Sequence, residues 1–127
     1  MIIVDTSALM AIVLNEKPAD ACIAVIESES NILISAGTLA ESFIVATRRR
    51  VIEEVEALVE RLGFEVANVT RATAMAVGDA HRKWGKGIHP AGLNFGDCFA
   101  YVLAKEYSCA LLYIGDDFAR TDVRSAL

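Results

Sequence analysis

A chain of 127 residues, 54% of them hydrophobic, is long enough for one domain with a buried core and too apolar to be disordered. Its net charge of −5 argues against nucleic-acid binding through bulk charge, so any such binding would need bound metal and a local basic patch. The longest clean apolar run, Ala8 to Leu14, is far too short to span a bilayer, and the N-terminus lacks the features of a signal peptide. We therefore expect a cytoplasmic protein with no membrane partner.

The predicted strands and helices alternate along the chain. Pro18 suits the first turn of a helix, and Gly63 suits the residue after the end of one. In chain order we predict a strand at 1–5, helices at 7–15 and 18–28, a strand at 31–35, helices at 39–50 and 52–62, a strand at 64–69, a helix at 71–84, a Gly/Pro-rich loop at 85–93, a helix at 94–107 and a strand at 110–114. This alternation predicts a single α/β domain over 1–127, a three-layer α/β/α sandwich with a central, mainly parallel sheet of four or five strands.

The three cysteines, Cys22, Cys98 and Cys109, are odd in number and widely spaced. There is no C-x-x-C pair, so neither a zinc site nor a disulfide framework is indicated. We expect small core residues in a reducing compartment.

Acidic residues recur where a predicted strand ends or a predicted helix begins: Asp5, Glu41, Asp97 and the pair Asp116/Asp117. The carboxyl ends of parallel strands are where open α/β sheets build their sites, so these side chains are expected to share one pocket. Carboxylates gathered without matching Lys or Arg repel one another unless they are protonated or bind a cation. Mg²⁺ or Mn²⁺ is the hard ion that suits such oxygen ligands, which points to hydrolysis of phosphodiesters.

Asp5 and Glu41 each have a structural alternative. Asp5 could cap the helix after it, with Thr6 and Ser7 as competing caps, or it could be a site residue whose carboxylate is oriented by the Ser7 hydroxyl. Glu41 fits a capping box opened by Thr38, in which the Glu side chain bonds back to the backbone of the cap. From the residues alone, we favour the site for Asp5 and the capping box for Glu41.

Asp97 is expected near the start of the helix that Asn94 opens, where it could serve the cap and the helix dipole. Gly96 beside it costs a helix about 1 kcal/mol relative to Ala, which indicates a close approach of the backbone to another group such as a phosphate. We therefore favour a functional role for Asp97.

The Gly-Asp-Asp turn after the last predicted strand could be a turn and no more. Adjacent acids on a turn point in different directions, so at most one is expected to reach the site. Asp116 is preferred over Asp117, with Asp122 as a weaker reserve.

Basic residues flank the Gly/Pro-rich loop before Asp97. Arg82, Lys86 and His89 are candidate contacts for a substrate phosphate. Trp84 is expected to anchor the loop.

Four segments together resemble the PIN domain, and more narrowly the VapC-type ribonuclease toxins of bacterial and archaeal toxin–antitoxin pairs. They are M-I-I-V-D-T-S-A-L at the start, an acidic residue early in the third helix, K-G-I-H-P-A-G-L-N-F-G-D-C, and L-L-Y-I-G-D-D-F. The resemblance covers essentially the whole chain. It implies a Mg²⁺- or Mn²⁺-dependent endoribonuclease that cleaves RNA with a metal-activated water, forms a homodimer and is held inactive by a cognate VapB-type antitoxin.

The resemblance places the family's first three acids on Asp5, Glu41 and Asp97 and its supporting hydroxyl on Ser7. It reverses the interpretation of Glu41 in favour of a metal site. Asp5 and Asp97 would hold the main ion directly, and Glu41 and Asp116 would act through waters or complete a second site. Many members carry the fourth acid at the position that is Gly115 here, so Asp116 or Asp117 must substitute.

The alternative is a non-catalytic acidic α/β interaction module whose carboxylates only cap helices. Metal binding separates the two, because only a native metal site would raise the melting temperature in millimolar Mn²⁺.

Overall fold

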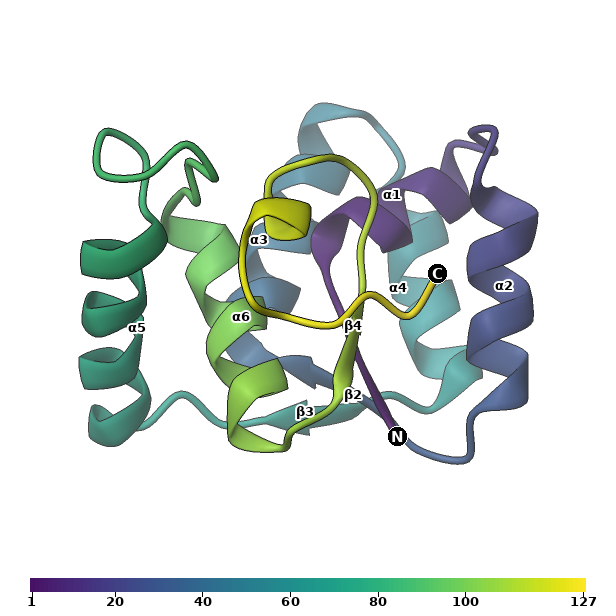
Figure 1. Cartoon of the computed structure of the whole chain (residues 1–127). Coiled ribbons are helices and arrows are strands. Elements are labelled where there is room, and N and C mark those ends of the chain that lie inside the picture. The colour runs from purple at the N-terminus through teal and green to yellow at the C-terminus, as the bar shows by residue number, and fades with distance from the viewer.

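The structure, a computed structural model, describes all residues from 1 to 127 and confirms the α/β/α architecture (Figure 1). Its elements in chain order are β1 (Ile2–Val4), α1 (Thr6–Val13), α2 (Ala19–Ser28), β2 (Ile32–Ser35), α3 (Ala36–Arg48), α4 (Ile52–Leu62), β3 (Glu65–Ala67), α5 (Arg71–Trp84), α6 (Phe95–Glu106), β4 (Ala110–Leu112) and the 3₁₀ turn η1 (Phe118–Arg120). The predicted strands and helices are all present. The ends of α4 and α5 match the prediction, those of the other elements are shifted, and η1 is an addition in the C-terminal segment.

The four strands form one parallel sheet in the order β3-β2-β1-β4. A single parallel bridge between Leu111 and Ser125 lies beside β4. It is held by a hydrogen bond from Leu111 N to Arg124 O (2.8 Å) and one from Ala126 N to Leu111 O (3.0 Å). The sheet therefore has four strands, and the C-terminal segment adds one bridge in place of the possible fifth strand.

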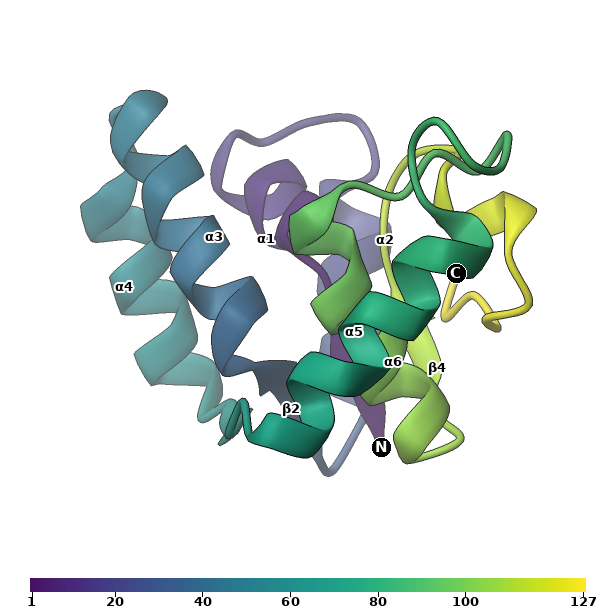
Figure 2. The same cartoon turned by 90° about the vertical axis from the view of Figure 1, so that its left-hand side faces the viewer.

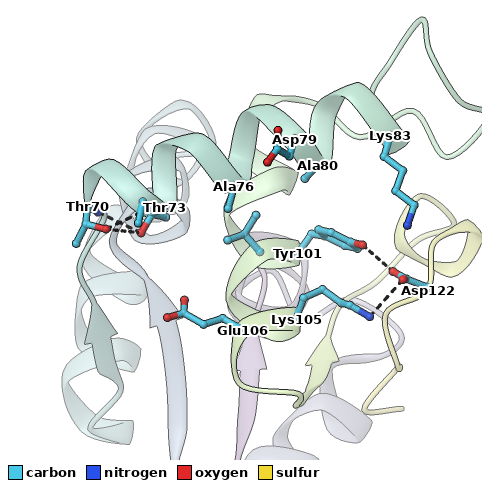
Figure 3. A pocket seen from close by; sticks show the side chains of 12 residues that line it. Thr70, Thr73, Ala76, Asp79, Ala80, Lys83, Tyr101, Lys105, Glu106 and Asp122 are labelled. Atoms are coloured by element: carbon cyan, nitrogen blue, oxygen red, sulfur yellow. Dashed lines mark hydrogen bonds and ion pairs between the residues drawn. The ribbon is translucent and has the colours of Figure 1, made fainter.

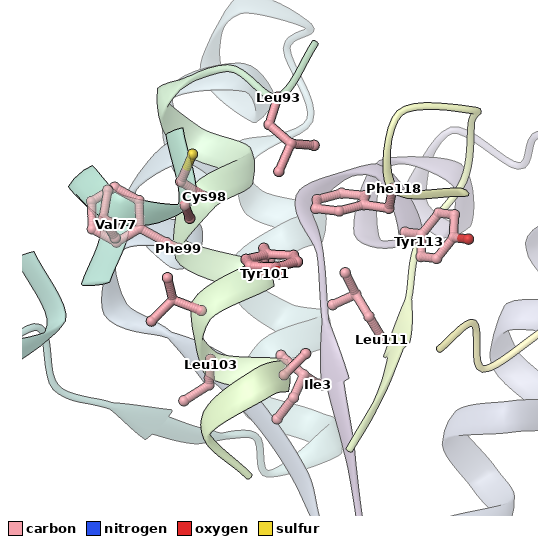
Figure 4. Packing of buried hydrophobic residues seen from close by; sticks show 14 of the residues in the cluster. Ile3, Val77, Leu93, Cys98, Phe99, Tyr101, Leu103, Leu111, Tyr113 and Phe118 are labelled. Carbon is pink, nitrogen blue, oxygen red and sulfur yellow. The ribbon is translucent and has the colours of Figure 1, made fainter. Parts of the chain in front are cut away.

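Successive residues of each strand face opposite sides of the sheet, as a period of two requires. Ile3, Leu33 and Leu111 pack with α5 and α6 in one buried cluster (Figure 4). Ile2, Val4, Ile32, Ile34 and Leu112 pack with α1, α2 and α4 in a second cluster. The two clusters are the two hydrophobic interfaces of a three-layer domain.

Helix α6 is buried over most of its circumference, from Gly96 to Ala104, with Asp97 as the half-exposed exception. Such a helix needs protein on every side. Figures 1 and 2 show the reason, because α6 stands between the sheet and the outermost helix α5. Contacts with α3 cover a further side of α6. The first turn of α6 is thereby held close to the edge of the sheet where β1 ends.

The cysteines make no disulfide, and Cys22 and Cys98 are buried as expected, whereas Cys109 is half-buried. None of the helices combines the length and apolar character needed to cross a bilayer.

The chain adds β2 and β3 on one side of β1 and returns to place β4 on the other side. This reversal makes the carboxyl end of β1 the switch point of the sheet, where open α/β sheets bind ligands. Asp5 is the first residue after β1, and its N–H bonds to Leu112 O on β4 at 3.0 Å. The topology therefore places Asp5 where a site was predicted.

Candidate functional site

Asp5 has the capping role that the sequence allowed for it, and it lies at the edge of the sheet where a site was expected. It is the N-cap of α1, and its Oδ2 accepts hydrogen bonds from Ser7 N (3.0 Å) and Ser7 Oγ (2.6 Å). Ser7 Oγ in turn accepts from Ile114 N (2.9 Å), at the end of β4. The other oxygen, Asp5 Oδ1, is buried without any hydrogen-bond partner, although Asp5 is only 3% exposed. A cap uses one oxygen, so the second remains available to a ligand.

Glu41 is held by α1 rather than by the start of its own helix. Its Oε1 accepts a hydrogen bond from Thr6 Oγ1 at 2.6 Å, across 35 positions of sequence. Thr6 Oγ1 also lies 2.9 Å from Ser42 Oγ and 3.3 Å from the carbonyl of Thr38. The Thr6 hydroxyl therefore joins α1 to α3 and points the Glu41 carboxylate toward the end of β1.

The capping box proposed for Thr38 and Glu41 is wrong. Helix α3 begins three residues earlier than predicted, and Ser35 is its N-cap, accepting from Gly37 N at 3.2 Å. Thr38 lies inside the helix, so Glu41 has no cap to serve.

Gly96 explains how Glu41 comes close to α6. A β-carbon at position 96 would overlap the Glu41 carboxylate, and one at Gly37 would stand 2.5 Å from the Phe99 ring. These two contacts pair α3 and α6 in antiparallel directions and need a glycine on each side. The close approach inferred for the Gly96 backbone is therefore an approach to a carboxylate of the same chain.

Asp97 belongs to a complete capping box at the start of α6. Its N–H donates to Asn94 Oδ1 at 2.8 Å, and its Oδ2 accepts from Asn94 N at 3.0 Å. Asn94 thus has the helix-opening role predicted for it and holds the Asp97 carboxylate in place. As with Asp5, one carboxylate oxygen remains for another ligand.

Of the two acids after β4, the structure favours Asp117 over the preferred Asp116. Both are exposed, and the charge of Asp117 is among the main causes that raise the pKa of Asp97. Asp117 directly precedes η1. Gly115, two residues before Asp117, has φ +108°, a conformation that side-chain-bearing residues rarely adopt. This backbone explains why an acid at Gly115 would be strained here.

The pKa values of Asp5 and Asp97 are raised by burial and by the charges of neighbouring carboxylates. Burial raises the pKa of Asp5 to about 6, and the charge of Glu41 adds to the effect. Burial likewise raises the pKa of Asp97 to about 7, with further contributions from the charges of Asp5, Glu41 and Asp117. The charges named among the main causes for these two groups are all carboxylates, so a positive partner would favour full ionisation of the cluster.

The residues of the site fit a hard divalent cation that takes few of its ligands from protein side chains. The unpartnered Asp5 Oδ1 and the mutual repulsion of the acids are what an oxygen-ligated ion would relieve. No three of the chain's His, Cys, Asp and Glu side chains are placed to ligate one ion together. An ion with few protein ligands and several waters, the habit of Mg²⁺, suits this geometry.

The three basic residues predicted as phosphate contacts differ in how accessible they are. His89 packs edge-on against Trp84, with ring centroids 4.7 Å apart, and its Nδ1 accepts from Ala91 N at 3.0 Å. Trp84 Nε1 donates to Tyr101 Oη at 2.9 Å, so the tryptophan anchors the loop as expected. Arg82 is exposed and forms an ion pair with Asp79, and Lys86 is exposed. Arg82 and Lys86 are thus the more accessible of the three predicted phosphate contacts.

A surface hollow of about 560 Å³ lies between α5 and α6, and none of Asp5, Glu41 and Asp97 lines it (Figure 3). Asp122 lines it and accepts hydrogen bonds from Tyr101 Oη (2.7 Å) and Lys105 Nζ (3.2 Å). Asp122, the weaker candidate among the acids, therefore holds the C-terminal segment on α6.

Comparison with known proteins supplies the family. A model of the PIN domain matches residues 2–124. Ribonuclease VapC42 of Mycobacterium tuberculosis is 40% identical over 129 residues, covering 98% of this chain and 98% of that protein. The chain belongs to the PIN-domain family of VapC proteins. Ribonuclease VapC36 of the same organism is also 40% identical to this VapC-family chain, over 95% of the chain and 90% of the relative.

Solved structures agree on the VapC fold. Mycobacterium tuberculosis VapC20, described as a sarcin-ricin loop cleaving toxin, superposes with a TM-score of 0.79 at 17% identity over 97% of this chain and 96% of that one. A toxin–antitoxin complex from Klebsiella pneumoniae gives a TM-score of 0.74 at 16% identity over 100% and 98%. At such low identity the likeness establishes the fold alone.

Proposed function

We propose that this VapC-family chain is a metal-dependent endoribonuclease and the toxin of a type II toxin–antitoxin pair. The observation that carries the proposal is the gathering of Asp5, Glu41, Asp97 and Asp117 near the switch point of the sheet, where burial and the charges of neighbouring carboxylates raise the pKa values of Asp5 and Asp97. Two relatives 40% identical to this chain are named ribonucleases, which favours RNA as the substrate.

Each residue of the candidate site has a defined role in this proposal. Asp5 and Asp97 would hold Mg²⁺ or Mn²⁺ directly, because each has one oxygen left over from its cap. Glu41 and Asp117 would act through waters, since no three side chains can ligate one ion together. Ser7 orients Asp5, and Thr6 orients Glu41. When bound, the ion would supply a more acidic water and positive charge beside the scissile phosphate.

Attraction of RNA to an acidic protein needs a local source of positive charge. The bound ion would provide the largest part, and the exposed Arg82 and Lys86 would add to it around the loop before α6. His89 would contribute less, because its ring is packed on Trp84.

A protein partner follows from the family. We infer a cognate VapB-type antitoxin, in line with the toxin–antitoxin complex from Klebsiella pneumoniae and the VapBC2 complex from Rickettsia felis that share this fold. We also infer a homodimer, which rests on the family resemblance alone. Exposed apolar side chains such as Ile44 on α3, 56% exposed, offer surface for such contacts. Light scattering of the purified chain tests the dimer, and a monomer at micromolar concentration would contradict it.

The direct test of the proposed function is cleavage of a mixed RNA by the purified chain with Mg²⁺ or Mn²⁺ and with EDTA. Cleavage that requires the metal is expected. The rival interaction module predicts no cleavage and no rise in melting temperature with millimolar Mn²⁺.

A further inference from the structure

Phe95 is an exposed aromatic residue in the first turn of α6, the turn that also carries Asp97. It is the first residue of α6, two positions before Asp97, and it is 74% exposed, the largest fraction among the large hydrophobic side chains exposed on this chain. Most of the Phe95 ring is in contact with solvent, so its face is free to bind a group from outside the chain.

The position of the Phe95 ring is constrained by its neighbours. It meets the Phe99 ring edge-to-face, with centroids 5.0 Å apart and planes at 90°. Phe99 is itself held against the Gly37 backbone of α3. A large ring that is both exposed and oriented has little conformational entropy to lose on binding.

The surroundings of Phe95 suit a nucleotide. The ring borders an open hollow of about 490 Å³ that α5 lines with Val77, Gly78 and Arg82. This volume is within the range of small-ligand sites. Apolar groups and a guanidinium are what the base and phosphate of a single-stranded nucleic acid use for stacking and charge neutralisation.

We propose that Phe95 is a stacking platform for an RNA base next to the scissile phosphate, with Arg82 facing a neighbouring phosphate. The inference rests on the proposed ribonuclease function and extends it to how the substrate is held. A nucleobase on Phe95 would set the position of the strand over Asp97 and Glu41, since Gly96 between Phe95 and Asp97 already contacts Glu41. Phe95 is thus a substrate-positioning residue.

The test is binding of a fluorescein-labelled single-stranded oligoribonucleotide, followed by anisotropy in EDTA at low salt so that the strand stays intact. Phe95→Leu, which keeps an apolar side chain without a ring face, is expected to weaken binding by roughly 5- to 150-fold. Phe95→Trp should retain binding. Tyr107→Leu is the matched control, because Tyr107 is an aromatic residue 47% exposed at the opposite end of α6.

Abasic substitution along the oligonucleotide identifies the stacked base. At one position, the loss caused by removing the base and the loss caused by Phe95→Leu should not add, because both remove the same contact. Additive losses at every position would overturn the proposal.

Two further outcomes separate this inference from the proposed function. Wild type that cleaves and binds RNA, with Phe95→Leu binding equally well, would overturn the stacking role alone. Wild type that neither binds nor cleaves any RNA would remove the ribonuclease function and the stacking role together. A change from dimer to monomer in Phe95→Leu, measured by light scattering, would assign the ring to a protein interface and contradict the proposal.

Discussion

The carboxylate of Glu41 lies against the backbone of Gly96, so that α3 delivers an acid to the first turn of α6. Only a residue without a β-carbon permits this contact. Glu41 and Asp97, which are 56 positions apart by their numbering, are brought to one site by a glycine placed next to Asp97.

Gly96→Ala should abolish most of the cleavage activity while the fold survives. In an unobstructed helix this change would add about 1 kcal/mol of stability. Here the new methyl group overlaps the Glu41 carboxylate, so we expect a net loss of stability and a displaced Glu41. Thermal melting and cleavage rate measure the two effects.

The matched control for Gly96→Ala is Gly78→Ala in α5, where the nearest heavy atom to a β-carbon is Arg82 Nη1 at 3.8 Å. It should stabilise the protein by about 1 kcal/mol. In a Glu41→Ala background, Gly96→Ala should also become stabilising. Equal behaviour of Gly96→Ala in both backgrounds would show that the Glu41 contact has no energetic consequence.

Thr6→Val should separate the positioning of Glu41 from its chemistry. The change keeps the shape of the side chain and removes the hydroxyl that donates to Glu41 Oε1. We expect a stability loss of about 1–2 kcal/mol and a 10- to 100-fold fall in activity, roughly the effect of removing an outer partner of a metal ligand. Thr47→Val on α3, where an exposed hydroxyl bonds to Phe43 O, should leave activity unchanged. Full activity of Thr6→Val would mean that Glu41 needs no such support.

Asp117 and Asp116 should differ when each is changed to Asn. Asp117→Asn removes a charge that raises the pKa of Asp97, so that pKa should fall and cleavage should slow by roughly 10- to 100-fold. Asp116→Asn should do neither. A titration of the Asp97 carboxyl by NMR together with cleavage rates tests both variants, and a larger effect at Asp116 would reverse the assignment.

The metal-free protein should lose stability as the pH rises from about 4 to 8. The pKa values of Asp5 and Asp97, about 6 and about 7 in the fold, lie above the ordinary 3.8. The folded state therefore binds more protons in this range, and the stability this gives is complete below pH 4 and lost above pH 7. For Asp5 alone the loss is about 3 kcal/mol.

Melting temperatures in EDTA across that pH range provide the measurement. Asp5→Asn should flatten the decline, because it removes one of the two titrating groups. Mn²⁺ should oppose the decline, since the ion favours ionised carboxylates. A melting temperature that falls equally in wild type and Asp5→Asn would contradict the assignment of these pKa values.

Some site residues could be predicted from the sequence because their positions depend on local structure. Asp5 ends a short apolar strand, and Asn94 and Asp97 have the spacing of a helix opening, so both places follow from neighbouring residues. The parallel sheet could be predicted because strands and helices alternate along the chain, and only the presence of a fifth strand was undecided.

The remaining features depend on contacts between distant segments. Helix α3 was predicted to start at residue 39, but it begins at Ala36, and its Gly37 makes room for the ring of Phe99 on α6. The partnership of Thr6 with Glu41 crosses 35 positions and leaves no local pattern. The directions of Asp116 and Asp117 depend on the backbone of the turn, in which Gly115 has a φ of +108°. A glycine inside a predicted helix beside a candidate acid was the one usable signal for the Gly96 contact.

The most direct test of the central claim compares wild type with Asp97→Asn in RNA cleavage, with Mg²⁺, Mn²⁺ or EDTA, on protein of known melting temperature. Asn keeps an oxygen that can accept from Asn94 N, so the helix start and the fold should survive. The account predicts cleavage by wild type with metal only and none by a folded Asp97→Asn. Cleavage by Asp97→Asn at the wild-type rate, or by wild type in EDTA, would contradict it.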